Sequence, residues 1–205
     1  MNNYKDFGWS DGATPAHDYL YDDLLGLLGN NKTILDIGCG NGVITNRLIR
    51  AGIDVFGIDA SVGGIKIAKK QNPDRFFVQD LTSGQLPDAL QHIQFDTLIS
   101  TEVIEHLYCP RGFVEFCKRI LLTNGQGGNL IISCPYHGYL KNLALAITGQ
   151  MDYHFQALWD GGHIKFWSKK TLTQLLEESG FRIIEFKGSG RFPFMWKSMF
   201  IKASI

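Results

Sequence analysis

The segment ILDIGCGNG, residues 34–42, constrains the fold of this chain more than any other stretch of the sequence. It begins as a short apolar run and ends in glycines at positions 38, 40 and 42, where a first strand is expected to turn into a first helix. Glycine tolerates positive φ angles and lets a ligand approach the backbone closely. Because position 43 is Val, the spacing departs from the G-x-G-x-x-G fingerprint of dinucleotide-binding loops. The segment therefore predicts a ligand-binding turn of another kind, at the edge of an α/β sheet.

Strand-like and helix-like segments alternate along the chain from about Lys32. Strands are predicted at 33–38, 53–59, 75–80, 95–101, 129–134, 181–187 and 199–203, and helices at 16–28, 41–50, 65–71, 111–122 and 168–179. Such alternation is typical of a mainly parallel sheet with helices on both faces. The last two strands are joined by a segment too short for a crossover helix, so they are predicted to be antiparallel neighbours. The fold class is therefore α/β, with a doubly wound, seven-stranded mixed sheet.

The 205 residues are expected to form one domain, 1–205, long enough for a sizeable buried core. Within it, residues 1–31 form a predicted N-terminal cap that contains an amphipathic helix. Residues 136–167 form a long insertion before the last helix, and such insertions are usually lids or binding segments. No apolar run approaches the length of a membrane span, and the N-terminus lacks a signal-peptide pattern.

The charge balance and the cysteine pattern narrow the choice of partners and of compartment. The chain has 20 basic and 20 acidic residues, whereas general nucleic-acid binding needs a basic excess, so no nucleic-acid partner is expected. The cysteines, at positions 39, 109, 117 and 134, form no C-x-x-C pair, which excludes a zinc ribbon and a thioredoxin motif. Free thiols in a cytoplasmic protein are expected. The sequence indicates no particular oligomeric state.

Three aspartates fall at the ends of three consecutive predicted strands. Asp36 lies just before the glycines, Asp59 closes the second strand and Asp80 closes the third. Open α/β sheets bind ligands at that edge. A carboxylate at position 36 is unfavourable beside a pyrophosphate, but it suits a ligand that carries sulfonium and ammonium groups. Asp59 can accept both hydroxyls of a ribose, and Asp80 can accept the exocyclic amine of adenine.

From about residue 32 onwards the sequence resembles the class I S-adenosylmethionine-dependent methyltransferases. ILDIGCGNG is similar to their cofactor loop, GIDAS to their ribose-binding strand end, FVQDL to their adenine contact, and FDTLISTEVIEHL to their fourth strand and the segment after it. The resemblance implies a Rossmann-like fold with an antiparallel last strand, and S-adenosylmethionine as cofactor. The expected cofactor-binding residues are Asp36, Gly38, Gly40, Asn41, Gly42, Asp59, Ala60, Asp80, Leu81 and Thr101, the last through its backbone.

Glu102, Glu105 and His106 follow the fourth predicted strand. On a helical turn, residues at i, i+3 and i+4 share one face, so two carboxylates and an imidazole are expected to converge at the mouth of the site. Such a set can bind a divalent cation or carry out acid–base chemistry. The plainer alternative has Glu105 capping a helix and His106 bonded to the backbone.

Two resemblances bear on this segment. With the later motif HIKFW, it resembles the metal set of the small-RNA 2′-O-methyltransferases, which implies that Glu102, Glu105, His106 and His163 are ligands of Mg, Mn, Fe or Zn. The order of EH, an insertion and then Gly162-His163 is also similar to the ubiquinone-pathway O-methyltransferases, which methylate phenolic hydroxyls on lipid-tailed rings. The length of the chain and its balanced net charge favour the ubiquinone-pathway group. That group carries an N-terminal arginine near the cofactor carboxylate, and residues 15–19 have none, so either Lys5 or His17 substitutes or the acceptor differs.

These patterns predict an S-adenosylmethionine-dependent enzyme that O-methylates a small aromatic or lipophilic acceptor. His106, beside Glu105, is the candidate general base, and a cation held by the metal set is the competing way to stabilise the oxyanion. Two further readings stay open, an RNA 2′-O-methyltransferase with a divalent metal and a non-catalytic S-adenosylmethionine-binding module. The insertion is expected to roof the acceptor together with Phe7 and Trp9, and its apolar stretch allows peripheral contact with a membrane.

Overall fold

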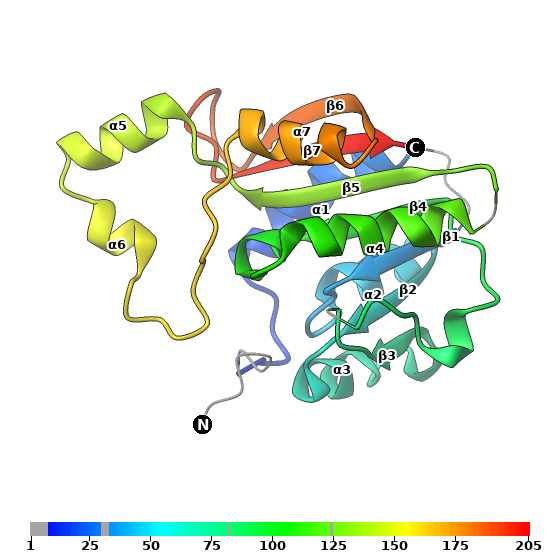
Figure 1. Ribbon diagram of the computed structural model, residues 1–205. Helices are drawn as coiled ribbons and strands as arrows, with labels where there is room; N and C mark the ends of the chain where they lie inside the picture. Colours follow the sequence, from blue (N-terminus) through cyan, green and yellow to red (C-terminus); the bar gives the residue numbers. More distant parts are fainter. Residues whose placement is uncertain (1–7, 30–32, 82, 124) are drawn as a thin grey trace.

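The computed structural model describes residues 8–29, 33–81, 83–123 and 125–205. A seven-stranded sheet runs through it in the order β3-β2-β1-β4-β5-β7-β6. The strands are β1 Thr33–Ile37, β2 Asp54–Asp59, β3 Phe76–Val78, β4 Thr97–Thr101, β5 Asn129–Pro135, β6 Arg182–Ser189 and β7 Ser198–Ser204. Neighbouring strands are parallel except around β7, which runs antiparallel to both β5 and β6 (Figure 1). The predicted α/β mixed sheet with an antiparallel last strand is confirmed.

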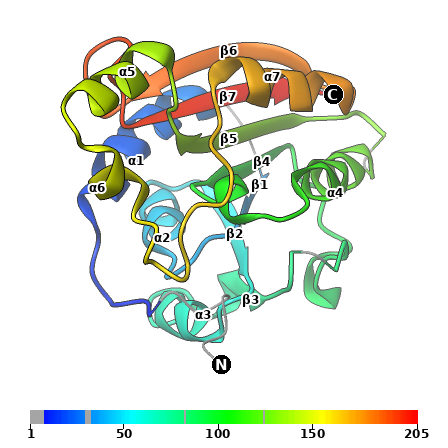
Figure 2. The ribbon, with the colours of Figure 1, turned by 60° about the vertical axis from the view of Figure 1, so that its left-hand side comes forward.

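Helices cover both faces of the sheet. The helices α1 Pro15–Leu28, α2 Val43–Arg50 and α3 Val62–Ala68 lie on one face, and α4 Pro110–Leu122 and α7 Lys169–Glu178 lie on the other (Figure 2). Along β1, Leu35 packs into the core with α4 and α7, whereas Ile34 packs with α1 and α2. Successive side chains of a strand point to opposite faces, so each buried strand contributes to both cores.

The predicted strands and helices occur with ends shifted by a few residues. Helix α2 begins at Val43 rather than at position 41, because Gly42 is its N-cap and has a left-handed backbone with φ of 73°. Helix α3 begins at Val62, before the predicted start at position 65, because the Ser61 hydroxyl caps it by accepting a hydrogen bond from Gly64 N at 2.9 Å. All four cysteines are free, as expected.

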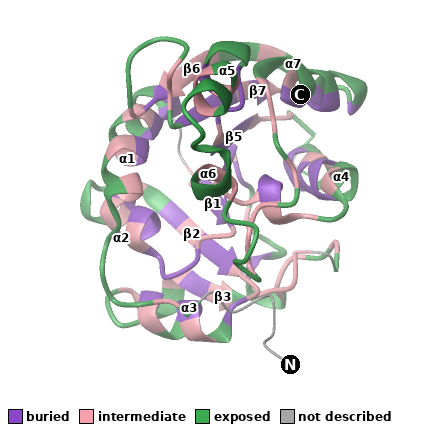
Figure 3. Ribbon diagram, turned by 90° about the vertical axis from the view of Figure 1, so that its left-hand side faces the viewer, coloured by how far each residue is buried: buried purple, intermediate pink, exposed green. Residues whose placement is uncertain are grey.

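The insertion 136–167 extends beyond the carboxyl ends of the parallel strands. It contains α5 Tyr139–Ile147 and α6 Met151–Phe155, which project at the left of Figure 1. Figure 3 shows that the surface of both helices is largely exposed, in contrast to the buried strands behind them. Among the residues described, no helix is long and apolar enough to cross a membrane.

Candidate functional site

The glycine segment forms a tight turn between β1 and α2. All three of its glycines have positive φ angles, 85°, 55° and 73° for Gly38, Gly40 and Gly42. A Cβ atom on Gly38 would lie 2.4 Å from Cγ2 of Val103, so the chain after β4 leaves no room for a side chain there. The amides of Gly38 and Cys39 both donate to the carbonyl of Ile58, at 2.8 and 3.1 Å. These bonds fix the turn against the end of β2.

Asp59, the last residue of β2, organises the same turn. Its Oδ2 accepts from the amide of Gly40 at 2.8 Å, and its Oδ1 accepts from the amide of Ser61 at 2.7 Å. Burial raises the pKa of the Asp59 carboxyl, and the two hydrogen bonds act against that rise. Each carboxylate oxygen has a second lone pair, so Asp59 can hold the loop and still accept hydrogen bonds from a ligand.

Asp36 is 1% exposed and has one oxygen without a donor. Its Oδ2 accepts from the Thr45 hydroxyl at 2.5 Å, but within the described part of the chain no donor reaches Oδ1. Burial raises the pKa of Asp36 to about 7, against the opposing effect of the Thr45 bond. A buried acceptor without a donor is costly, so this position favours a ligand with a cationic or hydrogen-bond-donating group.

A cavity of about 580 Å³ connects the glycine turn to the insertion. Nine predicted cofactor residues line it, namely Asp36, Gly38, Gly40, Asn41, Asp59, Ala60, Asp80, Leu81 and Thr101. The tenth, Gly42, is not among the lining residues. A Cβ atom there would lie 2.5 Å from Cβ of Ala68, so this glycine permits close contact with α3. The structure thus gathers the predicted cofactor set at the carboxyl ends of the parallel strands.

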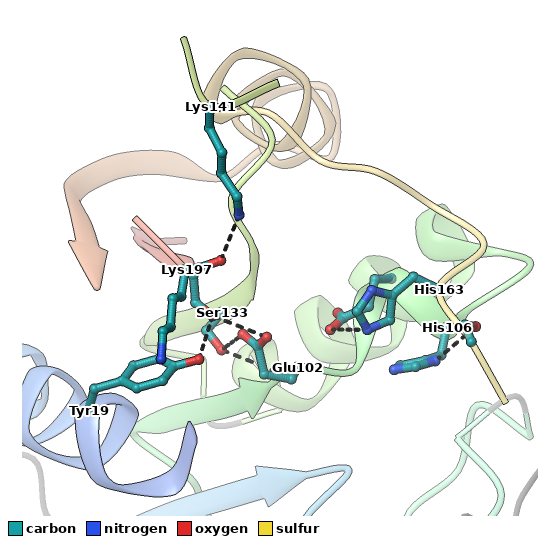
Figure 4. A network of polar contacts seen from close by, with 10 residues as sticks. Tyr19, Glu102, His106, Ser133, Lys141, His163 and Lys197 are labelled. Atoms are coloured by element: carbon teal, nitrogen blue, oxygen red, sulfur yellow. Dashed lines mark hydrogen bonds and ion pairs between the residues drawn. The ribbon is translucent and has the colours of Figure 1, made fainter. Parts of the chain in front are cut away.

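The segment after β4 does not form the helical face predicted for E-x-x-E-H. Glu102 has a φ angle of 54°, and only Ile104–His106 form a 3₁₀ turn. The Glu102 carboxylate lies toward the sheet, where it accepts from the hydroxyls of Ser133 at 2.8 Å and Ser198 at 3.2 Å (Figure 4). Burial raises the pKa of Glu102 to about 7, against these hydrogen bonds. The prediction of a shared face is therefore wrong for Glu102, because its left-handed backbone breaks the helical register.

Glu105, His106 and His163 do come together, and Figure 4 shows the two imidazoles beside each other. Their candidate ligand atoms lie within 4.8 Å of one another. The gap in sequence is closed by the end of the insertion, where the amides of Ile164 and Lys165 donate to the carbonyl of Glu105 at 2.9 and 3.0 Å. Of the four predicted metal ligands, three share one cluster and Glu102 does not belong to it.

The protonation states of this cluster follow from its burial. Burial raises the pKa of Glu105 well above its ordinary value, and the nearby Glu102 adds to the rise. Burial also lowers the pKa of His163 to about 4, with the nearby histidines adding to the decrease. Both shifts favour the uncharged forms, so the 4.0 Å contact between His163 Nε2 and Glu105 Oε1 is not an ion pair. Neither Glu105 oxygen has a hydrogen-bond partner among the residues described.

The imidazole of His106 contacts the backbone of the returning part of the insertion. Its Nδ1 lies 3.2 Å from the carbonyl oxygen of Gly162. A carbonyl only accepts, so this hydrogen bond requires the tautomer that carries its hydrogen on Nδ1. Burial lowers the pKa of His106, which favours the neutral form. The side chain lines the cavity and is therefore suited to accept a proton there.

The remaining predicted residues come from the N-terminal part of the chain. His17 lines the cavity, but its Nδ1 accepts from the amide of Thr14 at 2.8 Å and so caps α1. Trp9 lines the cavity, but it packs against the glycine turn rather than over the acceptor as predicted, because its ring lies beside Gly40 and Gly64. Lys5 and Phe7 lie outside the described residues. Tyr108, an exposed residue that lines the cavity, was not predicted, although its place two residues after His106 is a signal that could have identified it.

Comparison with known proteins gives matches over most of the chain. A family model described as a methyltransferase domain matches residues 15–185. A ubiquinone biosynthesis O-methyltransferase from Dinoroseobacter shibae is 31% identical over 160 residues, which cover 76% of this chain and 62% of the relative. A protein of the same name from a Ruegeria species is 30% identical over 169 residues, which cover 80% of this chain and 66% of the relative. The chain thus spans slightly less than two thirds of either relative.

Solved structures share the fold. The magnesium protoporphyrin IX methyltransferase of Synechocystis, crystallised with bound S-adenosylhomocysteine, superimposes with a TM-score of 0.69 at 20% sequence identity. The match covers 95% of this chain and 90% of that chain. At this level of identity the likeness concerns the fold.

Proposed function

The chain belongs to the methyltransferase domain family, and from that premise we propose that it transfers a methyl group from S-adenosylmethionine to a hydroxyl on a small aromatic or lipophilic acceptor. One observation carries the proposal. The acids at the strand ends and the imidazole of His106 line the same cavity, so the proposed cofactor site and the proposed proton acceptor share one space.

The acidic side chains that line the cavity fit S-adenosylmethionine. The buried Oδ1 of Asp36, which has no described donor, suits the ammonium or sulfonium end of that cofactor. Asp59 is placed to accept the ribose hydroxyls, while Asp80 and Leu81 would flank the adenine and the Thr101 backbone the methionine part. When bound, S-adenosylmethionine supplies a methyl group that its positive sulfur already activates.

The residues of the chain have two tasks in this reaction, orientation and proton removal. The pKa of a phenol is about 10, so a base or a cation is needed for it to react at neutral pH. In the neutral tautomer that donates from Nδ1 to the Gly162 carbonyl, His106 would accept the hydroxyl proton at Nε2. Glu105 lies beside His106 and is proposed as the second catalytic residue.

The acceptor class is supported by the walls near His106 and by the names of the relatives. Leu107, Tyr108 and Trp159 line that end of the cavity, and an aromatic or aliphatic acceptor would pack against them. Phenols, catechols and quinols should be screened with a methyl-labelled cofactor, and a labelled methyl ether is the expected product. Label that enters only RNA or protein would contradict the acceptor class.

A divalent cation is the second way to stabilise the acceptor oxyanion. Glu105, His106 and His163 would hold it, since their ligand atoms lie within 4.8 Å and the Glu105 oxygens have no described partner. Such an ion would act as a Lewis acid, and it would occupy the nitrogen that His106 otherwise uses as a base. If a cation is required, activity should fall in excess chelator and return with Mg²⁺, Mn²⁺, Fe²⁺ or Zn²⁺. Full activity in chelator, together with an unimpaired His163→Ala variant, would leave His106 as a simple base.

An RNA 2′-O-methyltransferase and a silent binding module are less favoured functions. The names of the relatives refer to ubiquinone biosynthesis rather than to RNA, and the complete acid set argues against a silent binding module.

We also propose a cytoplasmic location, which the free cysteines support. Peripheral membrane contact through the insertion is supported by exposed apolar side chains on α5, namely Tyr139, Leu140, Leu143 and Ile147.

A further inference from the structure

Residues 8–14 form an irregular segment, here called the N-terminal strap, that lies beside the glycine turn and leads into α1 (Figure 2). Two side chains from other elements bind it. The amide nitrogen of Asn41 donates to the carbonyls of Ser10 at 2.9 Å and Gly12 at 3.4 Å. The ammonium of Lys70 contacts both carboxylate oxygens of Asp11, at 2.9 and 2.7 Å.

Trp9 is the residue of the strap that packs on the cofactor end of the cavity, which is the part formed by the glycine turn and the strand-end acids. A Cβ atom on Gly40 would lie 2.5 Å from Cη2 of Trp9, and one on Gly64 would lie 3.0 Å from Cδ1 of the same ring. The indole therefore lies flush against the glycine turn and the first turn of α3. Trp9 also lines the cavity, together with Asp36 and Asp59. The strap is thus an outer wall of the space in which the strand-end acids lie.

The way the strap is held indicates that it can open. It has no helical or strand structure, and the Lys70–Asp11 pair is solvent-exposed, with side chains 58% and 67% exposed. Exposed ion pairs contribute little, and segments with few buried contacts open locally at low free-energy cost. The buried Asn41, in contrast, belongs to the rigid glycine turn. Its two hydrogen bonds therefore stabilise the closed position of the strap more than the exposed Lys70–Asp11 pair does.

We propose that the N-terminal strap completes the cofactor site. Trp9 covers the outer side of the site, and Asn41 is the positioning residue that holds the strap, and with it Trp9, in place. S-adenosylhomocysteine then leaves only when the strap lifts away from the glycine turn. This inference rests on the proposed function, because it requires that S-adenosylhomocysteine binds in the cavity. It assigns Asn41 a role through the strap in place of the direct contact with cofactor that the sequence suggested.

The test measures the dissociation rate of S-adenosylhomocysteine by stopped-flow displacement from the full chain. Trp9→Ala removes the wall, and Asn41→Asp keeps the side-chain shape but removes the donor. Each should speed dissociation about fivefold or more, the change expected for the loss of one or two hydrogen bonds or a comparable contact. Asp11→Lys should speed it by less, and adding Lys70→Asp to that variant should restore the wild-type rate.

The matched control is Arg111→Ala, which breaks the exposed Arg111–Glu178 pair far from the strap and should leave the rate unchanged. Wild-type dissociation rates in Trp9→Ala and Asn41→Asp would overturn the proposal. So would tighter binding in Trp9→Ala, because it would mean that the indole occupies cofactor space. If Asn41→Asp fails to fold, Trp9→Ala still decides, since a wild-type dissociation rate in that variant contradicts the proposal. A wild-type chain that binds no S-adenosylhomocysteine would instead contradict the proposed function itself.

Discussion

The two ends of the cavity are built in different ways. The cofactor end consists of strand ends and the glycine turn, and backbone hydrogen bonds such as those of Gly38 and Cys39 to Ile58 fix it. The acceptor end consists of a short 3₁₀ turn and the returning part of the insertion, joined through the carbonyls of Glu105 and Gly162. The acids of the first end are positioned by the sheet and the turn after β1, whereas the second end exists only when the turn after β4 and the end of the insertion meet. Changes at the two ends should therefore have separable effects.

The largest effect is expected at the acceptor end, from His106→Ala. Removal of a general base lowers the turnover number by about 10²–10⁴-fold. The affinity for S-adenosylhomocysteine should stay near the wild-type value, because His106 is not among the residues proposed to bind the cofactor. Steady-state kinetics with calorimetry separates the two quantities. The control is His92→Ala, at an exposed position that is not among the cavity-lining residues, and equal losses in both variants would contradict the role of His106.

Asp59→Ala should give the reverse pattern at the cofactor end. The variant loses the acceptor for the Gly40 and Ser61 amides as well as the proposed ribose contact, so S-adenosylhomocysteine should bind roughly 100-fold more weakly. Asp54→Ala, at the other end of β2, removes an exposed ion pair with Arg75 and serves as control. Unchanged affinity in Asp59→Ala would mean that the strand-end acids do not hold the ligand.

The smallest expected effect concerns pH. His106 must be neutral to accept a proton, so activity is full above its pKa and decreases as the pH falls through it. Burial lowers the pKa of His106 below its ordinary value of 6.5, so the acid limb should lie below pH 6.5. Along that limb kcat/KM should fall about tenfold per pH unit. A limb centred above pH 6.5, or one that persists in His106→Ala, would assign it to another group.

The sequence predicted the positions of the strand-end acids because these positions depend on local rules. Strand periodicity and the α/β order determine where a strand ends, so the sequence alone places Asp36, Asp59 and Asp80 at one edge of the sheet. The same reasoning gave the antiparallel β7. Only segment boundaries differed, as at Gly42, where a left-handed N-cap delays the start of α2.

The acceptor end was predicted in part because it depends on long-range contacts. The approach of His163 to Glu105 was expected, but Glu102 was placed on the wrong face. Its partners Ser133 and Ser198 lie 31 and 96 residues away, and no local pattern reveals either hydroxyl. A positive φ at a glutamate is equally hidden from propensity rules. The contact of Asn41 with the strap was missed for the same reason.

The most direct test of the proposed function is a calorimetric titration of the full chain with S-adenosylhomocysteine. The structure offers one cavity lined by the strand-end acids among the described residues, so we expect saturable binding of one ligand per chain. That binding should be lost or strongly weakened in Asp59→Ala and retained in His106→Ala. An absence of heat with both S-adenosylhomocysteine and S-adenosylmethionine, from a chain shown to be folded, would contradict the central claim.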